Sequence, residues 1–232
     1  EGTHVMSHAV IMPKVTIGKS CEIFPGAVIG AIPQDLKFDG EDTVVQIGDN
    51  TTIRECVTIN RGTKDKWKTV VGSDCLLMAY CHIAHDCIIG DHVIIANSVQ
   101  LAGHVEIGDY AIIGGMAAAI QFSKIGPHTY IAGRTEIIKD VPPYIKAGRS
   151  PLSYVGINSV GLQRRGFPSE KINNISEIYR NIYLRGLNIS QATSFIEKEF
   201  PDSEEKKEIL KFIKESSRGI LKVSSKEIKD EN

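Results

Sequence analysis

The chain has 232 residues, of which 24% are charged, and a formal net charge of −1. A chain with this balance lacks the basic face of a nucleic-acid-binding protein, and no stretch approaches the roughly 18 continuous apolar residues that predict a membrane span. No secretory signal peptide is recognisable. We therefore expect a cytoplasmic protein with no nucleic-acid partner and no transmembrane segment.

The first 137 residues carry a period of six. With three misses, an aliphatic residue recurs at positions 5, 11, 17, 23, 29, 47, 53, 59, 71, 77, 83, 89, 95, 101, 107, 113, 119, 125, 131 and 137. No α-helix has this period, whereas short hexads are typical of a parallel β-helix. We expect three hexads per turn, with successive coils about 4.8 Å apart and residues 18 apart stacked on one another.

Each hexad has two positions that we expect to face the axis of the coil: the periodic aliphatic residue and the small residue two before it. Burial of each inward Ile contributes roughly 1.5–3 kcal/mol. Four cysteines take the small position and are predicted to be core thiols in a reducing compartment: Cys21, Cys75, Cys81 and Cys87. Glycine often follows the aliphatic residue, and we expect it there because corners need unusual backbone angles: Gly18, Gly30, Gly48, Gly72, Gly90, Gly108 and Gly126.

The period is interrupted at residues 31–43 and 62–69, where we predict loops. Loops on repeat scaffolds often line the binding face. In the first interruption, the Asp35 carboxylate can accept sugar hydroxyls and the Lys37 amine can meet phosphate or carbonyl oxygen. A merely solvated loop remains the alternative for this segment.

The run from Cys81 to Cys87 holds two histidines and invites a zinc site. The hexad register argues against zinc, because both cysteines fall on inward positions while His82 and His85 fall on outward ones. An outward His85 beside an acid suits a general base instead. Gly103 lies 18 residues after His85, so its backbone N–H is well placed to stabilise an oxyanion. We predict no metal.

Residues 140–144 contain two consecutive prolines, which cannot continue a sheet ladder, and we expect the coil to end there. Beyond about Ser150 the chain is predicted to be helical, which gives a β-helix over residues 1–148 and an α-helical domain over 149–232. The apolar stripe from Ile172 to Ile182 predicts one helix, Asn188 offers a cap for a second over 190–200, and a third follows Pro201.

Several short motifs together resemble one family. They are the runs at residues 34–37, 82–86, 101–104, 114–116, 140–144, 164–167 and 217–219, in this order along the chain. In this combination they are similar to the bacterial UDP-N-acetylglucosamine O-acyltransferases, the first enzymes of lipid A synthesis, and the resemblance covers essentially the whole chain. It implies a mainly β fold, a left-handed parallel β-helix followed by a small α-helical domain, assembled as a homotrimer with active sites in clefts between subunits.

The resemblance also implies a reaction. A 3-hydroxyacyl group passes from acyl carrier protein to the 3-hydroxyl of the GlcNAc of UDP-GlcNAc, with no cofactor apart from the 4'-phosphopantetheine that the carrier protein bears. By position, His85 is the implied general base, Asp86 orients it, and the Gly103 amide is the oxyanion hole. Gly133 matches the acyl-chain ruler and implies a long-chain donor. The implied substrate-binding residues are Gln34, Asp35, Lys37, His82, His104, Gln121, Asn158 and Arg164.

Some positions depart from the best-known members of the family. Asn60 and Ile120 stand where those members have His, and Val160 stands where they have Glu. The chain also starts within a repeat, and we expect about two N-terminal coils of the family's β-helix to be missing. An acidic carrier protein needs a basic patch, for which Arg164, Arg165 and Arg218 are candidates.

Four alternative functions remain open. The N-acyltransferase of the same pathway carries an extra N-terminal domain and normally lacks the Gln-Asp-Leu-Lys loop. An acetyl-CoA-dependent acetyltransferase is distinguished by acetyl-CoA turnover. A γ-type carbonic anhydrase needs two histidines five residues apart, a spacing that none of the seven histidines here has. The last alternative is a structural solenoid without activity. Whether the acceptor is GlcNAc or its 3-amino analogue is also open.

Overall fold

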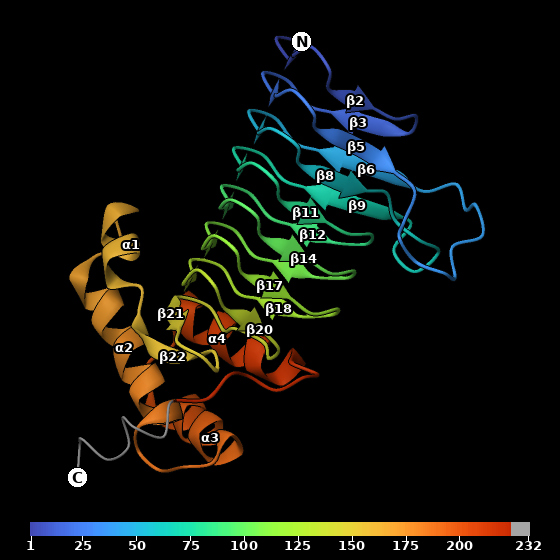
Figure 1. Cartoon of the computed structure of the whole chain (residues 1–232). Coiled ribbons are helices and arrows are strands. Elements are labelled where there is room, and N and C mark those ends of the chain that lie inside the picture. Colours follow the sequence, from blue (N-terminus) through green and yellow to red (C-terminus); the bar gives the residue numbers. More distant parts are fainter. Residues whose placement is uncertain (224–232) are drawn as a thin grey trace.

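The period of six produces one short strand per hexad, and three strands make one turn of a triangular coil (Figure 1). The computed structural model describes residues 1–223. Up to β20, every third strand joins the same parallel sheet, which gives the coil three flat faces. Sheet A contains β1 His4–Val5, β4 Glu22–Ile23, β7 Thr52–Ile53, β10 Leu76–Leu77, β13 Ile94–Ile95, β16 Ile112–Ile113, β19 Tyr130–Ile131, β21 Ile145–Gly148 and β22 Ser153–Ile157.

The other two faces have the same construction. Sheet B contains β2 Val10–Ile11, β5 Val28–Ala31, β8 Thr58–Asn60, β11 His82–Ile83, β14 Gln100–Leu101, β17 Ala118–Ala119 and β20 Glu136–Ile137. Sheet C contains β3 Val15–Ile17, β6 Val44–Ile47, β9 Lys68–Val71, β12 Ile88–Ile89, β15 Glu106–Ile107 and β18 Lys124–Ile125. We name each corner after the sheets it joins: A–B, B–C and C–A.

The predicted stacking of residues 18 apart is confirmed through the regular part of the coil. Leu76 pairs with Ile94, and His82 pairs with Gln100, both in parallel register. The periodic aliphatic residues fill the interior, and Cys21, Cys75, Cys81 and Cys87 are buried free thiols beside them. The fold class predicted from the sequence, a left-handed parallel β-helix of hexapeptide repeats followed by a few helices, is therefore confirmed.

We predicted that the corner glycines are there because corners need unusual backbone angles, and this is wrong at six of the seven positions. Of the seven, only Gly30 lies in the left-handed region of backbone space; elsewhere that region is taken two residues after the glycine, as at His92 after Gly90. Glycine is needed because the next coil passes too close for a side chain. A Cβ built at Gly90 lies 2.9 Å from the backbone nitrogen of Asp109.

The two prolines do not end the coil, contrary to our expectation. Val141 forms a bridge with Ile125, and β21 continues sheet A in parallel register, with Tyr130 opposite Lys146. Pro142 and Pro143 are tolerated because they occupy a corner rather than a strand, and the ladder bonds are made by their neighbours: the N–H of Gly126 donates to the carbonyl of Val141 at 2.7 Å. This turn of the coil spans 16 residues, two fewer than a regular turn of 18.

We had predicted that the chain is helical just beyond Ser150, and this prediction is wrong. The segment forms β22. It pairs antiparallel with β21, whose outer edge would otherwise be unpaired. The helices in the described residues follow: α1 Ser159–Arg164, which the sequence analysis missed, α2 Ser169–Tyr183, α3 Ile189–Glu199 and α4 Glu204–Glu215. None of the helices in residues 1–223 combines the length and the hydropathy of a membrane span.

The helix signals in the sequence agree with the structure. Ile172, Ile175, Ile178 and Ile182 are buried along one face of α2. Asn188 caps α3 in a reciprocal capping box with Gln191, as expected from its place before the apolar positions. The predicted domain boundary at 148/149 falls in the turn between β21 and β22. The division into 1–148 and 149–232 stays a prediction, and residues 224–232 lie outside the described residues.

We expect Ile95→Ala to lower the free energy of unfolding by about 2–5 kcal/mol, because it leaves a cavity at a position with 0% exposure between stacked coils. Ile138, which directly follows the periodic Ile137, is 48% exposed. Ile138→Ala is the matched control, with an expected loss below about 1 kcal/mol. Urea unfolding followed by circular dichroism measures both, and equal losses would contradict the inward assignment.

Candidate active site

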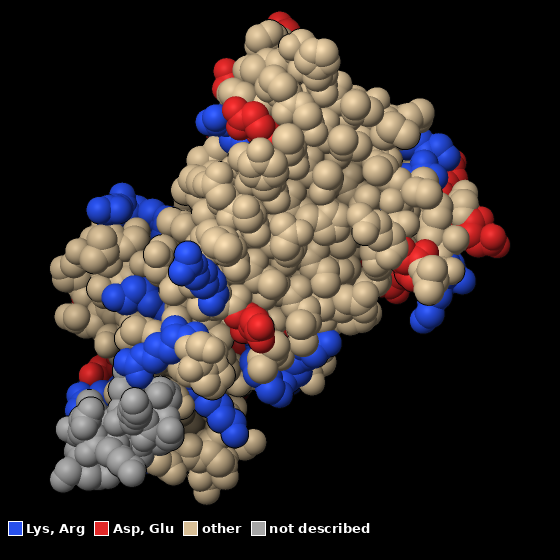
Figure 2. Space-filling view, viewed as in Figure 1, with Lys and Arg blue, Asp and Glu red and all other residues tan. Residues whose placement is uncertain are grey.

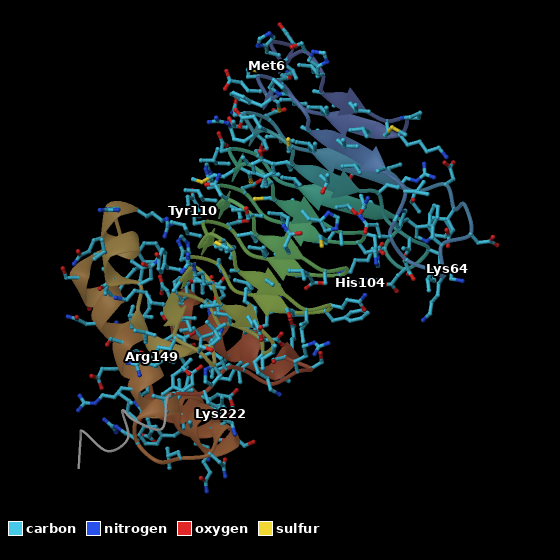
Figure 3. The ribbon with its side chains drawn as sticks, viewed as in Figure 1. Met6, Lys64, His104, Tyr110, Arg149 and Lys222 are labelled. Carbon is cyan, nitrogen blue, oxygen red and sulfur yellow. The ribbon has the colours of Figure 1, made fainter. Side chains whose placement is uncertain are left out.

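Both interruptions of the period leave the coil at the B–C corner. The first lies between β5 and β6 and the second between β8 and β9, so the two loops project side by side, as Figure 1 shows. Lys64 in the second loop and His104 on the coil lie on this side of the molecule in Figure 3. The predicted loops are therefore present, and they flank the corner that carries the polar cluster.

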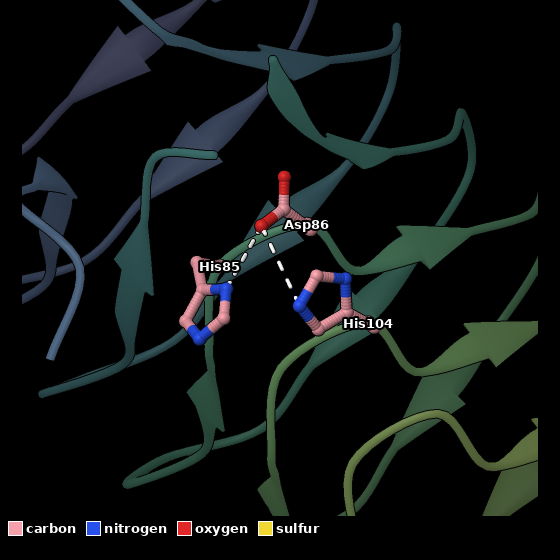
Figure 4. Close-up of side chains that lie close together, drawn as sticks. All are labelled: His85, Asp86 and His104. Carbon is pink, nitrogen blue, oxygen red and sulfur yellow. Dashed lines mark hydrogen bonds and ion pairs between the residues drawn. The ribbon is translucent and has the colours of Figure 1, made fainter. Parts of the chain in front are cut away.

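His85 and Asp86 form a buried pair at this corner, directly after β11. The Nδ1 atom of His85 lies 2.8 Å from Oδ2 of Asp86 (Figure 4). His85 points outside the coil, as the register predicted, yet it is only 5% exposed, and Asp86 is fully buried. The imidazole is thus oriented by a carboxylate that water does not reach.

Asp86 is held by the second loop as well as by His85. Its carboxylate accepts hydrogen bonds from the backbone N–H groups of Thr63 and Lys66 and from the Thr63 hydroxyl, at 2.6–3.1 Å. Burial raises the pKa of the Asp86 carboxyl, but the hydrogen bonds from Thr63 and His85 outweigh it, so the pKa lies below its usual value. The group therefore remains a carboxylate although it is buried.

Gly103 stacks on His85 as the 18-residue rule predicts. A Cβ at Gly103 would lie 2.5 Å from Cε1 of His85, so no other residue fits without moving the imidazole. The N–H of the next residue, His104, donates to the carbonyl of His85 at 3.0 Å. The N–H of Gly103 itself donates no hydrogen bond to any described residue, which leaves a free backbone donor beside the imidazole.

His104 completes the cluster from the next coil. Its ring meets His85 edge to face at 5.0 Å and stacks on Phe122 at 4.3 Å. Its Nε2 lies 3.9 Å from Oδ2 of Asp86. Its Nδ1 lies 3.0 Å from Oδ2 of Asp65, but the two atoms are not aligned for a hydrogen bond. Burial is the main cause that lowers the pKa of His104, which favours the neutral ring.

Two sets of residues at this corner could be considered as metal ligands. The thiols of Cys81 and Cys87 are buried inside the coil, whereas His82 and His85 lie outside it, so a Cys-His zinc set does not converge, as the register predicted. Burial also raises the pKa of the two thiols to about 11 and about 12. Ligand atoms of His85, Asp86 and His104 do lie within 4.8 Å of one another. However, the carboxylate of Asp86 already accepts several hydrogen bonds, which a cation would have to displace. The absence of a metal stays a prediction.

The remaining residues predicted on this side are more spread out. His82 lies on the outer face of β11, where its Nδ1 is 2.8 Å from the Thr58 hydroxyl, and burial lowers its pKa. Gln121 is exposed one coil beyond Gly103. In the first loop, the Asp35 carboxylate accepts the N–H of Lys37 at 3.0 Å, and the Gln34 and Lys37 side chains are exposed. Within residues 1–223, no hydrogen bond or ion pair joins these loop residues to His85.

Asn158 and Arg164 lie at a different edge of the chain. At the C–A corner, His92, Tyr110, His128 and Tyr144 stack in a ladder with ring centroids 4.4–5.5 Å apart. Asn158, just before α1, donates from Nδ2 to the carbonyl of His128 at 2.8 Å. Tyr110 and His104 lie on opposite sides of the coil in Figure 3, so a single chain does not bring Asn158 and Arg164 to His85.

Gly133 lies at the third corner, A–B, beside Gly115 of the preceding coil. A Cβ at Gly133 would lie 2.8 Å from the carbonyl oxygen of Gly115, so a side chain there requires a local shift. Gly133 is therefore separate from the His85 cluster within the chain.

Three loop residues contact the cluster but were not predicted from the sequence: Thr63, Asp65 and Lys66. The 18-residue rule does not apply across a loop, so the 23-residue separation of Thr63 and Asp86 gave no sign of contact. The available signal was the loop itself, since a segment extruded next to a buried acid is placed to supply its hydrogen-bond donors.

Comparison with known proteins gives one consistent result. Residues 140–221 match a family model described as UDP N-acetylglucosamine O-acyltransferase, domain 2, and residues 68–103 match bacterial transferase hexapeptide (six repeats). The acyl-[acyl-carrier-protein]–UDP-N-acetylglucosamine O-acyltransferase of Chlorobaculum parvum is 49% identical over 204 residues, which span 88% of this chain and 77% of that protein. The protein of the same name from Anaeromyxobacter sp. is 42% identical over 210 residues, 90% and 82% of the two chains.

A solved structure agrees with these relatives. The UDP-N-acetylglucosamine acyltransferase of Bacteroides fragilis superimposes with a TM-score of 0.93 at 50% identity, over 95% of this chain and 86% of that one.

The aromatic ladder makes stability depend on pH. Burial and the nearby Arg165 lower the pKa of His128 from 6.5 to about 4, although Asp109 opposes the shift. The unfolded chain therefore binds a proton first as the pH falls, and the free energy of unfolding decreases between pH 6.5 and 4.

His128→Phe keeps the ring stack but removes the group that titrates. We expect this substitution to reduce the pH-dependent decrease in the free energy of unfolding by about 1–2 kcal/mol, a value that allows for partial screening by solvent. Urea unfolding at pH 7 and pH 4.5 measures it, with His8→Phe at an exposed corner as the control. If His128→Phe keeps the wild-type pH dependence, the assignment to this ring is wrong.

Proposed function

The chain belongs to the UDP-N-acetylglucosamine O-acyltransferase family, and from this premise we propose how its residues carry out the transfer. It is an acyltransferase that moves an acyl group from acyl carrier protein to UDP-N-acetylglucosamine, in lipid A biosynthesis. We propose that the acyl group is a 3-hydroxyacyl chain and that the acceptor atom is the 3-hydroxyl of the sugar. The family assignment favours this reaction over the N-acyl and acetyl-CoA alternatives.

The observation that carries the proposed mechanism is the His85–Asp86 pair beside the free Gly103 amide. In our proposal His85 carries its proton on Nδ1, which donates to Asp86, and Nε2 accepts the proton of the sugar hydroxyl. The hydroxyl oxygen then attacks the carbonyl carbon of the thioester. The Gly103 N–H hydrogen-bonds the oxyanion that forms.

Collapse of this tetrahedral intermediate completes the reaction. The carbon–sulfur bond breaks, the acyl–oxygen bond remains, and the imidazolium of His85 returns its proton to the departing thiolate of the 4'-phosphopantetheine arm. Asp86 stays ionised throughout and stabilises the imidazolium, the role that a buried acid plays beside a catalytic histidine. The arm belongs to the carrier protein and is part of the substrate.

We further propose that the sugar nucleotide is bound by two edges of the coil from different subunits. One edge is the B–C corner of one subunit, with Gln34, Asp35, Lys37, His82, His104 and Gln121. The other is the α1 edge of a neighbouring subunit, with Asn158 and Arg164. The placement of these groups on opposite sides of one chain supports a homotrimer, because a three-fold rotation joins two unlike surfaces repeatedly and closes the ring.

The carrier protein is expected to meet basic residues near the same cleft. On the face shown in Figure 2, Lys and Arg gather mainly over the C-terminal helices and the last coils, while the middle coils show little charge. Of the three candidates, Arg164 is exposed, whereas Arg165 already makes a contact within the chain, with Nη2 donating to the carbonyl of Tyr110 at 2.8 Å.

Gly133 remains our proposal for the acyl-chain ruler, and cytoplasmic location stays a prediction.

Acyl transfer from 3-hydroxyacyl carrier protein to UDP-GlcNAc tests the mechanism. We expect His85→Ala to lower kcat by about 10²–10⁴-fold, because it removes the group that takes the hydroxyl proton in our proposal. His8→Ala, at an exposed corner, is the matched control and should keep wild-type activity. An inactive wild-type protein would refute the proposed reaction, and a fully active His85→Ala would refute the role of His85.

Mixed assemblies test the division of the site between subunits. His85→Ala and Arg164→Ala damage different edges, so a trimer built from both variants contains sites with two intact edges. We expect co-expression of the two variants in equal amounts to restore about a quarter of wild-type activity, from random assembly. Each variant alone, at the same total concentration, is the control. If the mixture is no more active than the two separate variants, the site does not combine these two edges.

A further inference from the structure

The second loop is closed over the catalytic carboxylate, and one side chain makes the shortest contact. The Thr63 hydroxyl donates to Oδ2 of Asp86 at 2.6 Å. The same oxygen faces Nδ1 of His85 at 2.8 Å, so Thr63 and His85 meet on one carboxylate atom. The backbone N–H of Thr63 adds bonds of 3.0 and 3.1 Å to the two oxygens of Asp86.

The carboxylate has little freedom to turn. Its other oxygen accepts the N–H of Lys66 at 3.1 Å, and the backbone N–H of Asp86 donates to the Thr69 hydroxyl at 2.9 Å. A carboxylate offers about four acceptor positions, and the loop and His85 together use them. Of the groups supplied by the loop, only the Thr63 hydroxyl is a side chain that substitution can remove.

The loop has other anchors that do not involve this hydroxyl. The N–H of Trp67 donates to the carbonyl of Thr63 at 2.8 Å, and the Lys66 amine pairs with Glu106 at 2.6 Å. Within the loop the hydroxyl also accepts the N–H of Asp65 at 3.3 Å, so it is one of several groups that hold the loop closed. Its contact outside the loop is with Oδ2 of Asp86, the atom that orients His85.

We infer that Thr63 is a positioning residue: its hydroxyl fixes Oδ2 of Asp86 against Nδ1 of His85, so that His85 keeps its proton on Nδ1 and presents Nε2 to the acceptor hydroxyl. This inference rests on the proposed role of His85 as general base. It gives the second interruption of the period a chemical purpose, since the extruded loop supplies the donors that the corner of a regular coil lacks.

The test compares Thr63→Val, which has the same shape without the hydroxyl, with Thr63→Ser, which keeps it. We expect Thr63→Val to lower kcat about tenfold with the KM for UDP-GlcNAc within about twofold, and Thr63→Ser to keep at least about half of the wild-type kcat. The matched control is Thr51→Val, a buried threonine at the C–A corner whose hydroxyl donates to the carbonyl of Gly72 at 2.8 Å. It should leave kcat unchanged.

A spectroscopic readout separates positioning from general packing. In protein with ¹⁵N-labelled histidine, the His85 ring signals, identified by their loss in His85→Ala, should report the Nδ1–H form in wild type and Thr63→Ser. In Thr63→Val we expect a mixture of the two neutral forms. If Thr63→Val loses more thermal stability than Thr51→Val, Thr63→Ala takes its place in both measurements.

Several results would overturn the inference: a wild-type kcat in the variant that lacks the hydroxyl, an equal defect in Thr63→Ser, an effect on KM alone, or an unchanged His85 ring form. Failure of the proposed function is recognised separately, because it shows as an inactive wild-type protein or as a fully active His85→Ala. An inactive His85→Ala together with a fully active Thr63→Val leaves the general base in place and removes only the role of Thr63.

Discussion

The close stacking of parallel coils is the constraint on which the rest of the structure depends. Because neighbouring coils are so close, each position tolerates one of three kinds of residue: one whose side chain points inward and fits the core, one whose side chain points outward, or glycine. The inward Ile and Cys residues, the glycines that follow them and the outward histidines are three results of that single limit. Because the stacking is regular, it also aligns outward groups from successive coils, and this alignment brings Gly103 and His104 to His85.

The chemistry depends on a departure from that regularity. A buried carboxylate such as Asp86 is unfavourable unless donors surround it, and the corner of an uninterrupted coil has few to offer. The loop after β8 provides these donors, and Asp86 is fully buried. Asp86 and His104 both adopt the left-handed backbone conformation that recurs at the corners, so the coil imposes the direction of these side chains before any of their contacts form.

Much of the fold and part of the site were predictable from the sequence, for identifiable reasons. Repetition fixed the inward place of Cys81 and the stacking of Gly103 on His85, since every coil repeats the same geometry. Prediction failed where a residue acts through tertiary context: Pro143 is acceptable because it falls on a corner, and β22 forms because β21 offers an open edge. Thr63 was missed because its partner lies across a loop, where sequence distance no longer measures space.

The place of the His85 pair along the coil has a consequence for how activity is lost. A stack of coils is close to a one-dimensional array in which each unit is stabilised by contacts with its two neighbours. The strand that precedes the pair, β11, has a coil stacked on each side, because it pairs with β8 on one edge and with β14 on the other. The pair is therefore held from both directions, and loss of chemistry should coincide with melting of these central coils.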